Sequence, residues 1–177
     1  EMRDPYTAGH QRRVAQIAVA ISKQLQLPED RIEGVHLASV VHDVGKIKVP
    51  AEILSKPGRL TINEFNLIKE HSQTGHDILK SIDYPWEIAE IVLQHHERLD
   101  GSGYPNGLKG DEILLEAQII AVADVVESMM SHRPYRPGLG VDAALEEIFL
   151  HRGGYFNADA VDICIKLFRE HGFRPSA

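Results

Sequence analysis

Several ionisable residues of this chain occupy positions at which a helix normally carries an apolar side chain. His10 lies four residues before Val14, and His71 lies three residues after Ile68, so helical spacing turns both imidazoles toward the apolar face. Asp124 stands within an otherwise apolar run. Burying a carboxylate there is costly unless a cation or several hydrogen bonds compensate it. This pattern predicts a metal site inside a helical bundle.

Two dipeptides add further donors at the ends of helical segments. His42 and Asp43 precede Gly45, and His95 is followed directly by His96. Adjacent helical residues point about 100° apart, so two metals or a site at the helix end are needed if both histidines are ligands. Imidazole and carboxylate donors without thiolate favour Fe, Mn, Zn, Co or Ni over a cysteine-type structural zinc.

Each of these positions also has a structural interpretation. A single histidine on an apolar face is more often a hydrogen-bonded core residue than a ligand. Asp124 could cap a helix or pair with an arginine, and a His-Asp dipeptide alone is a weak signal. Taken one at a time, these residues leave the choice open.

The apolar spacing predicts helices almost everywhere and no convincing strand. Thr61 and Glu64 form a capping-box pattern, and Gly172 is expected to stop the last helix. Irregular stretches are expected at 45–60, 99–111 and 132–140. We therefore expect one all-α domain over residues 1–177, a bundle of seven or eight helices with the metal site in its core. Its expected helices cover residues 14–25, 28–39, 61–79, 85–92, 115–130, 141–149 and 158–170.

The composition narrows the class of protein. The chain has 177 residues, ten histidines and a formal net charge of −7, which argues against general DNA binding. No apolar run approaches the roughly 18 residues of a membrane span, so no membrane insertion is expected. A single cysteine, Cys164, fits a reducing, cytoplasmic location. The start at Glu1 suggests excision from a longer chain with an N-terminal sensory or receiver domain.

Three motifs in order along the chain resemble one known family. They are His-Asp-Val-Gly-Lys at 42–46, His-His-Glu-Arg-Leu-Asp-Gly-Ser-Gly-Tyr-Pro at 95–105, and Arg-Pro-Tyr-Arg-Pro at 133–137. The first alone resembles many HD-domain phosphohydrolases. Together with the other two, which are highly specific, it resembles the HD-GYP family of bacterial cyclic di-GMP phosphodiesterases over almost the whole chain.

The resemblance implies a binuclear metal centre in which Asp43 bridges two divalent ions. One ion would be completed by His10, His42 and Asp124, and the other by His71, His95 and His96. Iron or manganese is favoured, with Zn, Co, Ni or Mg as alternatives. Some members bind a third metal through a glutamate four residues before the first histidine, but Tyr6 occupies that position here, so two ions are expected.

The resemblance also implies a reaction. A metal-bridging hydroxide would attack a phosphorus of cyclic di-GMP, giving linear pGpG and then GMP, with Asp43 and Lys46 as catalytic residues. Lys46, Tyr104, Arg133 and Arg136 would contact the substrate. Tyr104 has an equally good alternative, which is packing within its own loop, and the two arginines taken alone would suit a solvated loop.

Other interpretations stay open beside this one. Asp100 could orient His96 or organise the turn before Gly101. The chain could be a catalytically silent signalling module that acts by protein contacts, or a di-iron oxygenase on the same scaffold. The resemblance further implies a GGDEF-domain partner, and a dimer is one option for the oligomeric state.

Overall fold

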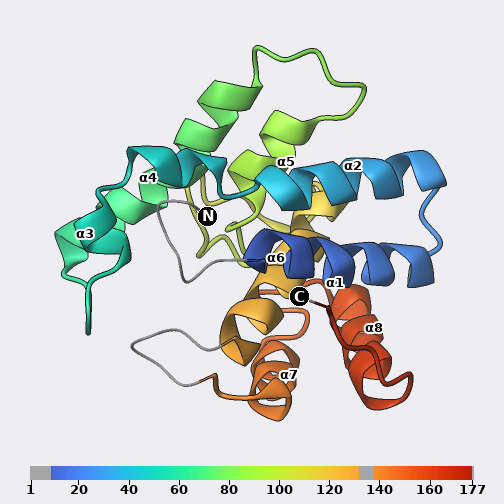
Figure 1. Cartoon of the computed structure of the whole chain (residues 1–177). Coiled ribbons are helices and arrows are strands. Elements are labelled where there is room, and N and C mark those ends of the chain that lie inside the picture. The colour runs from blue at the N-terminus through green and yellow to red at the C-terminus, as the bar shows by residue number, and fades with distance from the viewer. Residues whose placement is uncertain (1–8, 132–137, 177) are drawn as a thin grey trace.

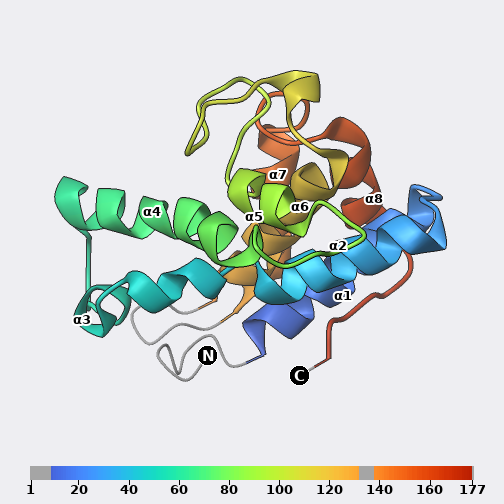
Figure 2. The same cartoon turned by 90° about the horizontal axis from the view of Figure 1, so that it is seen from above.

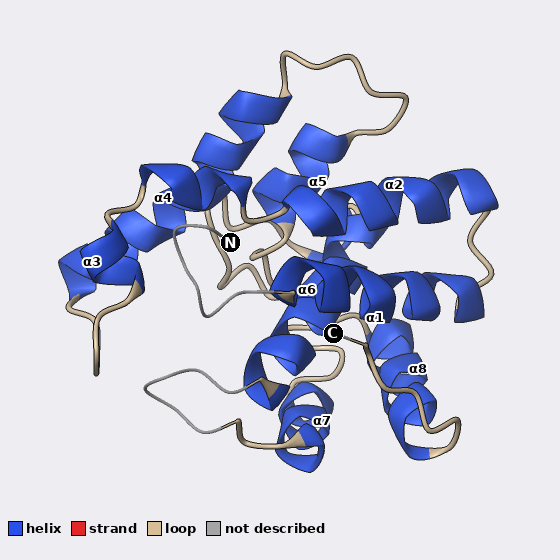
Figure 3. Ribbon diagram, viewed as in Figure 1, coloured by secondary structure: helices blue, strands red, loops and turns tan. Residues whose placement is uncertain are grey.

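The regular structure of the protein is helical. The computed structural model describes residues 9–131 and 138–176, and within these ranges it contains helices and no strand (Figure 3). The expected all-α class is therefore confirmed. The α-helices are α1 (His10–Gln24), α2 (Glu29–Val41), α3 (Ala51–Leu54), α4 (Ile62–Leu79), α5 (Ile88–Gln94), α6 (Leu115–Met130), α7 (Val141–Leu150) and α8 (Ala158–Arg169), and two 3-10 helices are η2 (Val44–Lys48) and η3 (Gly110–Glu112).

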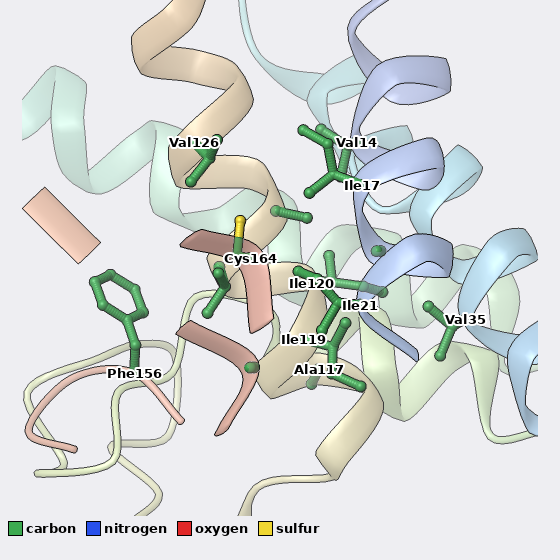
Figure 4. Close-up of a cluster of buried hydrophobic side chains, with 14 of the residues drawn as sticks. Val14, Ile17, Ile21, Val35, Ala117, Ile119, Ile120, Val126, Phe156 and Cys164 are labelled. Carbon is green, nitrogen blue, oxygen red and sulfur yellow. The ribbon is translucent and has the colours of Figure 1, made fainter. Parts of the chain in front are cut away.

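Helix α6 lies at the centre of the bundle. It packs against α1, α2, α5, α7 and α8, while α1 and α2 run side by side (Figure 1). Its residues Ile119, Ile120 and Val126 are fully buried and gather with Val14 and Ile17 of α1 (Figure 4). Because α6 is apolar almost all round, its acidic residues are placed in the interior with its apolar ones.

Helices α3 and α4 project to one side of the bundle, away from α8 (Figure 2). The inner part of α4 is fixed by contacts with α5 and with η2. Gly45 of η2 makes this approach feasible, because a Cβ added there would lie 1.9 Å from the carbonyl oxygen of His71. The close approach brings the segment after Asp43 against the helix that carries His71.

The sequence located most helix boundaries to within a few residues. The capping box at the start of α4 is confirmed, since the Glu64 amide donates to the Thr61 hydroxyl and the Glu64 carboxylate accepts from the Thr61 amide. The expectation of an irregular 45–60 segment was wrong, because most of η2 and all of α3 fall within it. A bond from the Lys46 amide to the Asp43 carbonyl continues the turn after α2, and Pro50 precedes α3. Among the described helices, none is long and apolar enough to cross a membrane.

Candidate metal centre

All seven residues expected to be ligands meet in one place. Donor atoms of His71, His95 and His96 lie within 4.8 Å of one another, and the same holds for His10, His42 and Asp124. They come from the start of α1, the end of α2, the middle of α4, the end of α5 and the middle of α6. A third group, formed by His42, Asp43 and His95, meets the same distance limit and links the other two.

Asp43 lies between the two groups of donors. Its Oδ2 atom is 3.5 Å from Nε2 of His42 and 3.8 Å from Nε2 of His10. Its Oδ1 atom is 3.5 Å from Nε2 of His71, which belongs to the other group. One carboxylate oxygen therefore faces each group, which is the arrangement that a bridging ligand requires.

Three histidines are oriented by the helix that carries them. The Nδ1 atoms of His42, His71 and His95 lie 2.7, 2.7 and 2.6 Å from the backbone carbonyl oxygens three residues earlier. A carbonyl oxygen only accepts, so each Nδ1 carries a proton and Nε2 is the nitrogen of each ring that is left to bind a cation. Burial lowers the pKa of His71 and His95, so Nε2 of these two neutral rings presents a bare lone pair.

This orientation shows that the donors suit a cation. Nε2 of His71 lies 3.3 Å from Nε2 of His95 in the buried interior. Two lone pairs that face each other at this distance repel, and a positive ion between the donors converts the repulsion into coordination. The side chains present therefore fit a metal that takes imidazole and carboxylate ligands.

The protonation states support the same conclusion. Burial lowers the pKa of His95 to about 3, and burial beside His95 lowers the pKa of His96. Both rings are neutral near pH 7, as ligands must be. Burial alone would raise the pKa of Asp43, but nearby positive charge, chiefly the Lys46 ammonium 2.7 Å away, holds it well below its usual range.

His10 has an acidic neighbour that the sequence interpretation missed. Its Nδ1 contacts the carboxylate of Glu127, and its Nε2 lies 3.3 Å from Oδ1 of Asp124. Burial lowers the pKa of His10, but hydrogen bonds to these two carboxylates and the charge of Asp43 outweigh burial and raise it to about 9. Glu127 had the same signal as Asp124, an acidic residue in an apolar helix.

A cavity of about 850 Å³ opens beside the donors. Three of the donor residues, His71, His96 and Asp124, line it together with Lys46 and Tyr104. The other lining residues come mainly from 54–68, with Arg98 and 125–129 completing the wall. This volume lies within the range of pockets that hold small organic ligands.

The comparisons with known proteins agree with this geometry. A family model described as "HD domain" matches residues 1–159. The cyclic di-GMP phosphodiesterase response regulator RpfG of Xanthomonas campestris is 40% identical over 168 residues, which cover 94% of this chain and 44% of that protein. The chain belongs to the HD-GYP family of HD domains.

Other relatives extend the comparison. The 3'3'-cGAMP-specific phosphodiesterase 3 of Vibrio cholerae is 40% identical over 146 residues, 82% of this chain and 32% of that protein. A solved HDG"Y"P protein, Bd1817 from Bdellovibrio bacteriovorus, shares the fold with a TM-score of 0.74 at 18% identity, over 90% of this chain and 51% of that one. The chain spans less than half the length of the curated relatives it matches.

A buried glutamate, Glu97, organises the loop that contains Gly103, Tyr104 and Pro105. The carboxylate of Glu97 accepts hydrogen bonds from the amides of Asn106 and Leu108, at 2.7 and 3.1 Å. A Cβ on Gly103 would lie 2.4 Å from the Cα of Glu97, so the loop folds tightly onto the segment after the histidine pair. Tyr104 consequently stacks on His96, with ring centroids 4.7 Å apart.

The structure also settles some of the open choices. Asp100 accepts hydrogen bonds from the amide and hydroxyl of Ser102, so it organises the turn before the tyrosine. Three histidines lie outside the groups of donors: His36 and His171 are exposed, and His76 pairs with Glu90. Three residues of the sequence interpretation lie outside the described part of the chain: Tyr6, Arg133 and Arg136.

Proposed function

We propose that the chain is a metal-dependent phosphodiesterase that hydrolyses cyclic di-GMP to linear pGpG and then to GMP. One observation carries the proposal: two groups of donors share Asp43 and face a cavity that Lys46 lines. A binuclear centre beside a cationic wall suits the cleavage of a phosphodiester. The names of the HD-GYP relatives add support, since they describe enzymes that act on cyclic dinucleotides.

We assign one ion to His10, His42 and Asp124 and the other to His71, His95 and His96, with Asp43 shared, and we favour iron or manganese. When bound, such a pair would supply a water acidic enough to act as a nucleophile near neutral pH and would neutralise charge on the phosphoryl oxygens. The neutral imidazoles of His95 and His96 and the ionised Asp43 are already in the protonation states that this role requires, whereas His10, whose pKa is raised to about 9, has to release a proton when it binds an ion.

The remaining residues bind and orient the substrate. The Lys46 side chain is 25% exposed and lines the cavity, and its Nζ lies 2.7 Å from Oδ2 of Asp43, so a phosphate that it binds is held against the donors. Arg59 and Arg98 add positive charge to the same wall. Tyr104 covers His96 with one ring face and borders the cavity, where we expect it to contact the dinucleotide. We assign phosphate contacts to Arg133 and Arg136 as well.

The test is product analysis with several dinucleotides. Protein loaded with Mn(II), or anaerobically with Fe(II), is incubated separately with cyclic di-GMP, 3'3'-cGAMP and cyclic di-AMP, and the products are separated by chromatography. We expect pGpG and then GMP from cyclic di-GMP. The variant Asp43→Asn should lose turnover, while His76→Ala, which removes a histidine outside the centre, should retain it.

Each alternative has its own outcome in this test. Two bound ions but no cleavage of any dinucleotide at micromolar enzyme would contradict the proposal and favour a silent signalling module. Oxygen consumption by the Fe(II) form without phosphodiester cleavage would favour an oxygenase. Preferred cleavage of 3'3'-cGAMP would keep the reaction and change the substrate.

We also propose a reducing compartment, the cytoplasm, because Cys164 is a buried free thiol. The excision from a longer chain, the GGDEF-domain partner and the dimeric state stay predictions.

A further inference from the structure

The histidines of the metal centre are held by two different kinds of acceptor. His42, His71 and His95 each direct Nδ1 to a carbonyl oxygen of their own helix or of the turn that continues it, three residues earlier. Every helix provides such carbonyls near its end and along its length. These rings therefore keep their orientation without help from another element.

His10 has no such support from its own helix. It is the first residue of α1, so no earlier turn of that helix supplies a carbonyl. Its Nδ1 instead contacts Oε2 of Glu127, which reaches it from α6. The opposite nitrogen, Nε2, points at Asp124 and Asp43, with distances of 3.3 and 3.8 Å to their carboxylate oxygens.

Glu127 is itself fixed and deeply buried. Its side chain is only 2% exposed, and its Oε1 atom accepts from Nε of Arg13 at 2.6 Å and from the hydroxyl of Ser131. Arg13 lies one turn after His10 on α1, and Glu127 lies one turn after Asp124 on α6. The carboxylate thus joins the two helices at the point where both present a donor to the centre.

We propose that Glu127 is a positioning residue for the metal site formed by His10, His42 and Asp124. Its carboxylate holds the proton of His10 on Nδ1, aims Nε2 at the site and makes the imidazole a stronger donor. The inference rests on the proposed binuclear centre and deepens it. His10 then differs from its neighbour His42 in the same site, which is oriented by a backbone carbonyl, as His71 and His95 are in the other site.

The test measures metal affinity site by site. In Glu127→Gln the amide oxygen can still accept from His10, but the NH₂ group then faces the N–H of Arg13, and the negative charge is lost. We expect the affinity for one of the two ions to fall about 10- to 100-fold and the other to be nearly unchanged, by titration of Mn(II) or Zn(II) against a competing chelator.

A matched control lies on the same helix. Glu116 of α6 pairs with Arg31 of α2 at 2.7 Å, so Glu116→Gln removes an equivalent carboxylate–arginine pair without touching a histidine. Both affinities should survive in this variant. A double-mutant cycle then tests whether Glu127 acts through His10: in a His10→Ala background, Glu127→Gln should change the affinities by about twofold or less.

The outcomes separate this inference from the function it rests on. A wild-type chain that binds fewer than two ions contradicts the binuclear centre itself. Two ions in the wild type and unchanged affinities in Glu127→Gln overturn the role of Glu127 alone. If that variant does not fold, ¹⁵N NMR of the histidines in the Zn(II)-loaded wild type decides: coordination of His10 through Nε2 supports the inference, and coordination through Nδ1 refutes it.

Discussion

Gly45 packs closely against α4 beside the metal centre, and we predict that Gly45→Ala disrupts this packing. The added Cβ would lie 1.9 Å from the carbonyl oxygen of His71 and 2.6 Å from the amide nitrogen of Gly75. Both are backbone atoms, so no side-chain rotation can relieve the overlap. The segment 43–46 and α4 have to separate.

The size of the effect follows from these distances. Ordinary contact begins near 3.4 Å, so the Gly45 backbone and the His71 carbonyl must move apart by about 1.5 Å. Overpacking of this kind costs about 1–3 kcal/mol or more, and a backbone clash belongs at the upper end. For a domain of 177 residues, about 3 kcal/mol lowers Tm by roughly 6–12 °C. The same displacement would spoil the alignment of Asp43 with His71.

Thermal unfolding of the metal-free protein measures the packing cost without the contribution of metal binding. Gly154→Ala is the control, since its Cβ would meet only the carbonyl oxygen of His151, at 3.7 Å. We expect Gly45→Ala to unfold well below this control and to bind fewer than two Mn(II) ions per chain. Equal Tm values for the two variants would refute the packing argument.

Three further predictions concern single residues elsewhere in the chain. Hydrogen bonds from Lys56 and the helix cap lower the pKa of Glu64 to about 2. The ionised carboxylate therefore stabilises the fold above the ordinary pKa near 4.5, and this stabilisation is lost as the pH falls toward 2. ¹³C NMR should show the pKa of Glu64 rising in Lys56→Met, and an unchanged value would contradict the assignment. Glu97→Gln should speed hydrogen exchange at the two loop amides that the carboxylate binds and reduce turnover, whereas Glu116→Gln should do neither. Burial raises the pKa of Cys164 to about 12, so a thiol reagent at pH 8 should modify it only after unfolding; fast labelling of the folded protein would show that the thiol is accessible.

The sequence was informative about the metal centre because buried charge is conspicuous in an apolar helix. His10, His71 and Asp124 break the helical periodicity of their surroundings, and the structure places them where that break indicated. Glu127 carried the same signal and was overlooked, because no motif drew attention to it. The family resemblance implies the expected ligands but not Glu127, so the sequence interpretation did not consider the residue that contacts His10.

The short elements were harder to predict. The 45–60 segment has too few apolar residues in periodic positions to indicate a helix, yet η2 and α3 form there. Gly45 has no side chain to pack, and it is needed because the His71 carbonyl passes so close to it. Such a requirement comes from a contact between distant segments, and nothing in the local sequence around Gly45 shows it.

The sequence by itself determined the helical class and the family, since periodicity and motif spacing are properties of the chain alone, and through the family resemblance it predicted the donor residues. Only the tertiary structure decided how the donors are divided in space. It placed one oxygen of Asp43 toward each group and turned the lone pairs of His71 and His95 toward each other. It also brought Glu127 to His10 across 117 positions of the chain, because helices α1 and α6 pack together in the core.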